Sequence, residues 1–178
     1  MYFTYILTEV IYFVKKSEWA PKRPLSWRST VQLTLYTDYS LRTLIYLGLH
    51  PEGATVAEIA ESYRISRNHL VKVVHNLGKL GLIHTTRGKS GGISLAKEPA
   101  AIRVGDVVRK VEPNFNWVEC FDAETNTCPI EGACRLHTIL EEAQEALLNV
   151  LNRYTLQDIL VGESELLRML ATPAPQSA

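Results

Sequence analysis

Three cysteines lie close together in the second half of the chain, at Cys120, Cys128 and Cys134. The residues from 118 to 133 are otherwise polar and turn-forming, which predicts that the thiols share a loop between two helices. Thiolates are soft ligands that suit zinc and iron–sulfur clusters, so the pattern indicates a metal site. Zinc sites usually have ligand gaps of about two to four residues, and the longer gaps here favour the bulkier cluster.

Two alternatives to a cluster stay open on spacing alone. One is a structural zinc ion held by the three cysteines and His137, and the other is a set of free or redox-switching thiols. An enzyme is not expected, because no Ser-His-Asp, metallohydrolase or nucleotide motif accompanies the thiols. An odd number of cysteines without a Cys-x-x-Cys motif also argues against a secreted disulfide scaffold, so a cytoplasmic location is expected.

Charge is distributed unevenly along the chain, although the 178 residues carry a formal net charge of zero. Residues 31–111 carry eleven basic and six acidic side chains, whereas residues 112–178 carry three and eleven. Ten basic residues fall between positions 64 and 110, with only Glu98 and Asp106 as acidic ones. Such a concentration of positive charge is typical of a phosphate-binding surface, so this part of the chain is expected to meet nucleic acid.

The basic region contains three predicted helices. The first begins near Thr37, and the second begins at Thr55, where Glu58 completes a capping box. Ser66 is expected to cap the third helix, which runs to Leu80. Two short capped helices joined by a tight turn are typical of a helix-turn-helix.

The third helix has two distinct faces when successive residues are turned by about 100°. One face is apolar and consists of Leu70, Val73, Val74, Leu77 and Leu80. The opposite face is polar and basic, which favours a DNA-recognition helix over the more common solvated face. The residues expected to contact DNA from this helix are Ser66, Arg67, Asn68, His69 and Lys72.

A hairpin is expected after the third helix. Residues 82–86 and 93–95 are strand-like, and the basic segment RGKSGG joins them, so that Arg87 and Lys89 would enter a minor groove. The segment is not a P-loop, because Ile83 stands where the first glycine is required. The pattern predicts a winged helix-turn-helix domain over residues 31–111, mainly α with a small β wing. A winged helix used only for protein contacts is the alternative.

A longer helix is expected after the cysteine loop of residues 112–134. Its apolar residues recur at alternating steps of four and three, which is heptad spacing. Residues 135–161 are therefore predicted to form a dimerisation helix and a C-terminal helix, and the chain is predicted to be a homodimer. The alternative is an amphipathic helix packed on its own domain. The predicted seam consists of Leu136, Leu140, Ala143, Leu147, Val150 and Tyr154.

The two ends of the chain lack the periodicity of the rest. Residues 1–30 contain an apolar stretch that is too short to span a bilayer, and they show no signal-peptide pattern. We interpret them as a flexible arm or as the result of a misassigned start, with the native chain beginning at Val31. Residues 162–178 are expected to be a flexible tail.

Six blocks of sequence follow one another between Gln32 and Leu160: QLTLYTDYSLR, SRNHLVKV, RGKSGGISL, IRVGDVVRKVEP, CPIEGACRL and YTLQDIL. Together they resemble the bacterial winged-helix regulators that hold iron–sulfur clusters, above all the nitric-oxide-sensing branch of that family. The resemblance implies a homodimeric repressor that binds double-stranded operator DNA. It also implies that the three cysteines hold an iron–sulfur cluster, which nitric oxide destroys.

The resemblance also implies a fourth ligand, whose identity varies within the family. Asp38 matches the aspartate that reaches the partner subunit's cluster in the nitric-oxide-sensing branch, and it is favoured here. His137 stands where the branch that regulates cluster supply has a histidine ligand. Without a metal, Asp38 would be a helix N-cap and His137 a solvent-facing residue. Three cysteines and one further ligand fit a [2Fe-2S] or a [4Fe-4S] cluster equally well.

The family resemblance suggests how such a cluster would control DNA binding. Ligation by Asp38 would tie the first helix of one subunit to the cysteine loop of the other, and so set the distance between the two recognition helices. That distance must be about 34 Å, one duplex turn, or a multiple of it. Loss of the cluster would let it relax. A regulator of cluster supply and a zinc-stabilised winged-helix protein are the alternative functions.

Overall fold

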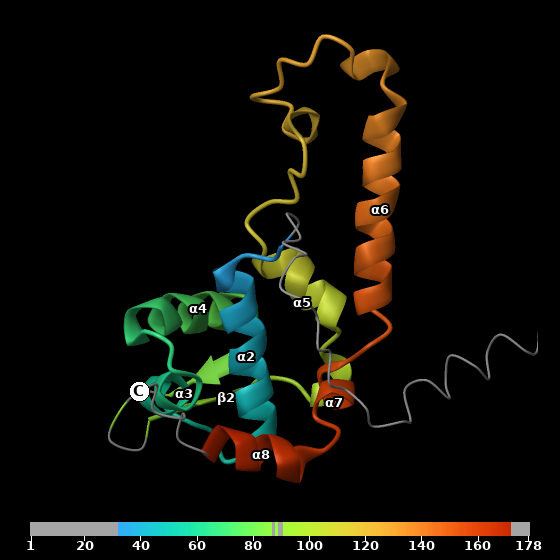
Figure 1. The fold of residues 1–178 in the computed structure, drawn as a ribbon. Helices are drawn as coiled ribbons and strands as arrows, with labels where there is room; N and C mark the ends of the chain where they lie inside the picture. The colour runs from blue at the N-terminus through green and yellow to red at the C-terminus, as the bar shows by residue number, and fades with distance from the viewer. Residues whose placement is uncertain (1–31, 87, 89–90, 172–178) are drawn as a thin grey trace, which may run out of the picture. The chain divides into compact units, whose positions relative to one another are not determined.

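The computed structural model describes residues 32–86, 88 and 91–171, so the expected extension of residues 1–30 lies outside the described residues. The described chain is mainly helical with one small antiparallel sheet, as predicted. None of its helices is both long and apolar enough to cross a membrane. In chain order (Figure 1), its elements are α2 (Leu35–Leu49), α3 (Val56–Tyr63), α4 (Arg67–Lys79), β1 (Ile83–Thr85), β2 (Ile93–Leu95), the 3-10 helix η1 (Pro99–Ala101), α5 (Val104–Val111), the 3-10 helices η2 (Glu119–Phe121) and η3 (Glu131–Ala133), α6 (Arg135–Leu151), α7 (Leu156–Ile159) and α8 (Glu163–Ala171).

Helix α2 lies at the centre of the packing, because it contacts α4, α5, α7 and strand β2. Its Leu44 and Leu47 are fully buried, together with Ile59 of α3 and Leu70 of α4. Truncating such a leucine to alanine typically costs about 2 to 5 kcal/mol of stability. The helix begins two residues earlier than predicted, because Thr34 provides its N-cap.

Helices α3 and α4 form the predicted helix-turn-helix. The reciprocal hydrogen bonds of the capping box between Thr55 and Glu58 are present, and Arg64 ends α3 with a left-handed backbone at φ 56°. Ser66 stands at the N-cap of α4, as predicted, but its side chain makes no capping hydrogen bond. The bond is missing because the backbone N–H of His69, which a capping side chain would satisfy, donates to the Ser66 carbonyl instead.

The wing is anchored on the domain by the roots of its two strands. Strands β1 and β2 pair antiparallel, with Ile83 opposite Leu95, and both Ile83 and Ile93 are buried. A bridge between Ala54 and Ile93 attaches β2 to the segment before α3. The adjacent Gly53 has φ +89°, and a Cβ there would lie 2.9 Å from the Ile93 carbonyl oxygen, so only glycine fits this position.

Helices α5 and α6 cross at close range and enclose a second, smaller core. Val104 and Val108 of α5 pack there against Leu148 of α6. Gly105 makes the crossing possible, because a Cβ at this position would lie 2.6 Å from the Leu148 carbonyl oxygen and would also collide with the Asn152 side chain. Helix α5, from whose end the cysteine loop begins, is therefore packed against the C-terminal half of α6, the helix that follows the loop.

The prediction of a flexible tail over residues 162–178 was wrong for its first half. Residues Glu163–Ala171 form helix α8, which contacts α3, and Leu170 packs against the main core. Leu166 and Leu170, one helical turn apart, give α8 an apolar side, and packing that side against the domain stabilises the helix. Residues 172–178 lie outside the described residues.

Candidate metal centre and nucleic-acid interface

The three cysteines lie on the segment between α5 and α6, which leaves the end of α5 and returns to the start of α6 (Figure 1). All three thiols are free and partly exposed. Cys120 lies in η2, Cys128 lies three residues before η3, and Cys134 is the N-cap residue of α6. The cysteine loop is therefore attached directly to the helix that carries the predicted dimer seam.

Side-chain hydrogen bonds hold the cysteine loop together. The backbone N–H and the hydroxyl of Thr127 both donate to Oε1 of Glu119, at 2.8 and 2.6 Å. These bonds favour the charged form of the Glu119 carboxyl and lower its pKa. Glu119 and Thr127 each directly precede a cysteine, so this pair, which we call the loop clamp, joins the chain at Cys120 to the chain at Cys128.

The thiols are close enough to influence one another electrostatically. Desolvation raises the pKa of Cys120, and repulsion from the Cys128 and Cys134 thiolates and the Glu131 carboxylate raises it further. Over the described residues, no three His, Cys, Asp or Glu side chains gather in an arrangement ready to hold a metal ion. The residue types still fit a soft metal centre, because one loop carries three free thiols, the ligands that such a centre prefers.

His137 lies beside the cysteine loop of its own chain. Its ring packs edge-on against Phe121, with the ring centroids 5.1 Å apart, and its Nδ1 lies 3.3 Å from a carboxylate oxygen of Glu141. The alternative of a solvent-facing residue holds only in part, because Phe121 covers one side of the ring and the side chain is 27% exposed. Of the two candidate fourth ligands, His137 is the one that contacts the cysteine loop of its own chain, through Phe121, the residue after Cys120.

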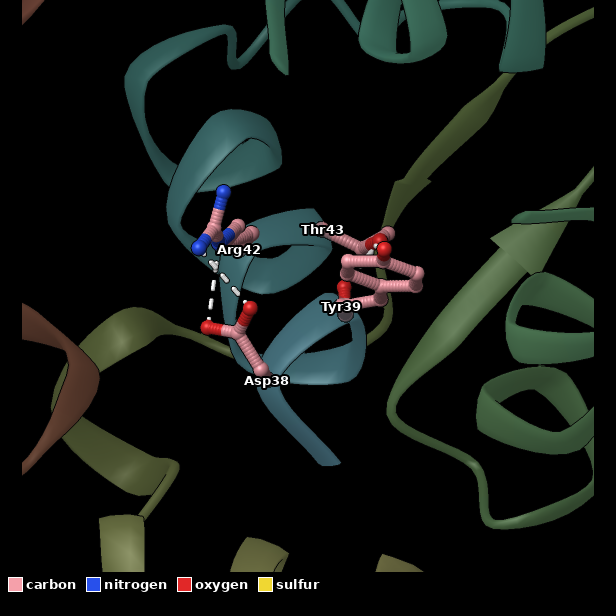
Figure 2. A network of polar contacts seen from close by, with 4 residues as sticks. All are labelled: Asp38, Tyr39, Arg42 and Thr43. Carbon is pink, nitrogen blue, oxygen red and sulfur yellow. Dashed lines mark hydrogen bonds and ion pairs between the residues drawn. The ribbon is translucent and has the colours of Figure 1, made fainter. Parts of the chain in front are cut away.

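Asp38 lies in the first turn of α2 and is not the N-cap, which is Thr34, so that alternative reading of Asp38 was wrong. Both of its carboxylate oxygens are held by Arg42: Nε donates to Oδ1 at 3.0 Å, and Nη2 lies 2.8 Å from Oδ2 (Figure 2). The Arg42 guanidinium also lies 5.8 Å from the ring centroid of Tyr63, whose pKa burial raises to about 12. Within the described chain, Asp38 does not join the thiols of its own subunit.

Sequence reasoning missed Glu112, which caps the end of α5. Its carboxylate accepts hydrogen bonds from the backbone N–H and the hydroxyl of Thr34, both at 3.2 Å, and from the hydroxyl of Thr37. A negative charge at this end of α2 is also favoured by the helix dipole. Glu112 therefore joins the start of the cysteine loop to the start of α2. Thr34 before an apolar run is a visible capping signal, but no pattern connects it with a residue 78 positions away.

Helix α4 presents the predicted polar face to solvent. Its apolar residues Leu70, Val73, Val74 and Leu77 are buried, and Leu80 is partly buried. Arg87 and Lys89 of the wing tip lie outside the described residues. The residues of the predicted DNA contact that are described are all exposed: Ser66, Arg67, Asn68, His69 and Lys72.

Two tyrosines at the start of α2 contact the exposed helix α4. The Tyr36 hydroxyl donates to the Lys72 carbonyl at 3.4 Å, and the Tyr39 ring stacks on the ring of His69 with centroids 6.2 Å apart. Asp38 lies between these tyrosines in the sequence, and Figure 2 shows the Tyr39 ring directed away from the contact between Asp38 and Arg42. The first turns of α2 therefore carry the ion pair between Asp38 and Arg42 on one side and contact α4 on the other.

Helix α6 exposes the predicted seam and packs on α5 through a different face. That packed face is centred on Leu148, which is 2% exposed, with Leu151 beside it. The helix thus packs on its own domain, as the alternative reading has it, but through residues other than the predicted seam, and the dimer stays a prediction. Leu140 is the partly buried member, and the exposed members are Leu136, Ala143, Leu147, Val150 and Tyr154.

Comparisons with known proteins agree with this arrangement. A family model described as Rrf2, iron-dependent transcriptional regulator, matches residues 33–162. The HTH-type transcriptional regulator NsrR of Shouchella clausii is 54% identical over 142 residues, which are 79% of this chain and 95% of that protein. NsrR of Bacillus subtilis is 48% identical over 142 residues, 79% of this chain and 97% of that protein.

Two solved structures illustrate that the fold is known. IscR of T. potens superposes with a TM-score of 0.60 at 24% sequence identity, covering 82% of this chain and 95% of that one. CymR, the global cysteine regulator of B. subtilis, superposes with a TM-score of 0.56 at 27% identity, covering 72% and 95%. The fold of most of the chain is thus shared with solved structures.

Proposed function

Because the chain belongs to the Rrf2 family of transcriptional regulators, we propose that it is a homodimeric repressor that responds to nitric oxide through an iron–sulfur cluster. The observation that carries the proposal is the position of the cysteine loop. Three free thiols lie on a clamped loop that ends at the N-cap of α6, and α6 exposes an unpartnered apolar seam. Relatives that are about half identical and carry the name NsrR support the same assignment.

Cys120, Cys128 and Cys134 are the proposed cluster ligands. An iron–sulfur cluster, whether [2Fe-2S] or [4Fe-4S], would supply iron that nitric oxide can attack. The role of the loop clamp is to hold the chain at Cys120 beside the chain at Cys128, so that less conformational freedom has to be lost when the thiols converge on one group.

Asp38 of the partner subunit is the proposed fourth ligand. Arg42 of that same subunit contacts both oxygens of the Asp38 carboxylate, so Asp38 would ligate through a lone pair that Arg42 leaves open, with Arg42 orienting the carboxylate. A carboxylate is a hard ligand in a thiolate site and therefore the weakest link in the set.

The position of His137 favours a second candidate, a regulator of cluster supply with a histidine ligand. His137 already lies against Phe121, next to Cys120, and needs no second subunit to reach the cysteine loop. Ligation through Nδ1 would require His137 to give up its contact with Glu141. A zinc ion bound by the same four residues is the corresponding alternative without a cluster.

Dimerisation through α6 would cover the exposed seam. The step pattern of its apolar residues fits a paired helix, and an apolar stripe of this length is more stable when it is buried. In such a dimer, the two α4 helices would read half-sites spaced by about 34 Å or a multiple of it. The polar face of α4 would lie in the major groove, and Arg87 and Lys89 would reach the minor groove.

The contacts of α2 suggest how the metal centre and the DNA would be coupled. Glu112 ties the start of α2 to the start of the cysteine loop, and Tyr36 and Tyr39 tie it to α4. Ligation of Asp38, or the loss of that ligation, would therefore change the position of α2 and, through these contacts, the position of α4. Glu112, Tyr36 and Tyr39 are positioning residues in this account, because none of them touches DNA or the metal centre.

Anaerobic purification with metal analysis tests the proposed centre. We expect a brown protein that contains iron and acid-labile sulfide, and we expect Cys120→Ala, Cys128→Ala and Cys134→Ala each to lose both. Thr125→Ala, a change on the same loop, is the matched control and should keep the wild-type content. Asp38→Ala and His137→Ala in the same series distinguish the two fourth ligands. A colourless protein with zinc in place of iron would exclude the cluster.

A further inference from the structure

A groove of about 640 Å³ runs along one edge of α4, between that helix and strand β1. Its floor is apolar and includes Val71, Val74 and Ile83. Its rim is polar and includes His75, Lys79 and His84. His75 and Lys79 belong to the polar face predicted for this helix, but none of the six was in the set of residues predicted to contact DNA.

The groove lies between the two elements that the proposed function places in DNA. Helix α4 forms one wall, and β1, which leads into the wing, forms the other. In B-DNA, the major and minor grooves are separated by a single sugar–phosphate backbone. A domain with α4 in the major groove and its wing in the adjacent minor groove must let that backbone pass between the two elements. The surface that it crosses is this groove.

We propose that the groove receives the sugar–phosphate backbone of the operator, with His75, Lys79 and His84 contacting its phosphates. The inference rests on the proposed DNA binding and adds a set of contacts to it. The apolar floor would lie under the deoxyribose rings, and the half-exposed Val71, at 55% exposure, would be covered.

The charge of the groove fits an anionic occupant. Its titratable residues are His75 and Lys79 from α4 and His84 from β1, while α3 contributes Val56. No carboxylate lines this groove, whose lining belongs entirely to the described residues. Glu58, the nearest carboxyl along α3 in sequence, bonds to the backbone N–H of Thr55 in the capping box. The basic rim therefore favours DNA over the apolar segment of another protein, which is the other occupant to test.

Histidine contacts give the proposal a readout that a purely structural role would not change. A histidine beside a phosphate contributes a released counterion only when it is protonated, and histidine titrates between about pH 5 and 8. The salt dependence of DNA binding should therefore be steeper at low pH than at high pH. Each phosphate contact that is removed should lower the slope of log affinity against log salt concentration by about one.

The experiment uses the full-length, anaerobically purified protein and a duplex that the wild type selects from a random pool. Salt titrations are measured for the wild type, His75→Gln/His84→Gln and Lys79→Gln. Near pH 6, the slope of the double variant should be smaller than the wild-type slope by about two, and near pH 8 the two slopes should converge. Lys79→Gln should lower the slope by about one at both pH values, and Lys79→Arg should restore it.

Two controls keep this result distinct from the proposed function. His50→Gln, whose side chain pairs with Glu52 away from the groove, should keep the wild-type slope at both pH values. The inference is wrong if the groove variants have the wild-type salt slope while Lys72→Ala lowers it. In that case the protein binds DNA, but the groove does not contact the backbone. If the wild type selects no duplex at all, the proposed DNA binding itself fails.

Discussion

Glu119 and Thr127 are joined by two hydrogen bonds across the cysteine loop, and each residue directly precedes a cysteine. Thr127→Val removes the hydroxyl bond at 2.6 Å and keeps the size of the side chain. The loss of one such hydrogen bond destabilises the ordered loop by about 1 kcal/mol, and by more when the acceptor is charged. We expect the visible absorbance of the variant to decay about five times faster than that of the wild type under a fixed excess of iron chelator.

Thr125→Val is the matched control for the loop clamp, because it makes the same change two residues earlier. It should decay at the wild-type rate. Equal decay rates for Thr127→Val and the wild type would show that the clamp has no part in holding the metal centre.

The helix-turn-helix and the cysteine loop could be predicted from the sequence, because their signals are local. The capping box joins Thr55 to Glu58, three positions apart, and the faces of α4 follow from its own periodicity. The contacts between distant segments could not be predicted in this way. Glu112 reaches Thr34 because α5 and α2 pack together, and helix α8 is stabilised where Leu170, partly buried, packs against a core formed by other elements.

Gly105 tests the close crossing of α5 and α6. Gly105→Ala places a Cβ 2.6 Å from the Leu148 carbonyl oxygen, which α6 cannot avoid without moving away. Overpacking of this kind costs about 1 to 3 kcal/mol, and we expect that loss in the free energy of unfolding measured by urea denaturation.

Gly78→Ala is the corresponding control in helix α4, where an added Cβ meets no atom within 4 Å. Alanine is the better helix former, so this change should leave stability equal or raise it by up to about 1 kcal/mol. A Gly105→Ala protein as stable as the wild type would mean that the two helices can separate freely.

Leu147 tests the proposed dimer seam, since it is 36% exposed in the single chain. Leu147→Glu would bury a carboxylate at the same place in both helices of a dimer. We expect the dissociation constant, measured by sedimentation equilibrium, to rise by at least about tenfold, which corresponds to about 1.4 kcal/mol. Asn149→Glu adds the same charge at an exposed polar position beside the seam and should dimerise normally. Equal effects of the two changes would place the interface elsewhere.

The capping box of α3 predicts a pH dependence of stability. Hydrogen bonds from the Thr55 backbone N–H and hydroxyl lower the pKa of Glu58. A carboxyl whose pKa is lower in the folded state stabilises the fold above its unfolded pKa, near 4.3, and loses that contribution as the pH falls through the folded value. Glu58→Gln keeps a capping side chain but cannot titrate, so its melting temperature should fall less than that of the wild type between about pH 5 and 3.

Glu61→Gln removes a carboxyl from the same helix outside the capping box and serves as the control. Its melting temperature should follow the wild-type pH dependence. If Glu58→Gln follows the wild type just as closely, the Glu58 carboxyl contributes nothing to the pH dependence of stability.

The most direct test of the central claim is a DNA-binding titration before and after nitric oxide. The duplex is one that the wild type selects from a random pool, and the proteins are the cluster-loaded and cluster-free forms of the full chain. We expect the loaded form to bind tightly, and a stoichiometric dose of nitric oxide to weaken its binding by at least about a hundredfold, to the level of the cluster-free form. Equal binding by the loaded and cluster-free forms, or loss of the chromophore without release of DNA, would contradict the account.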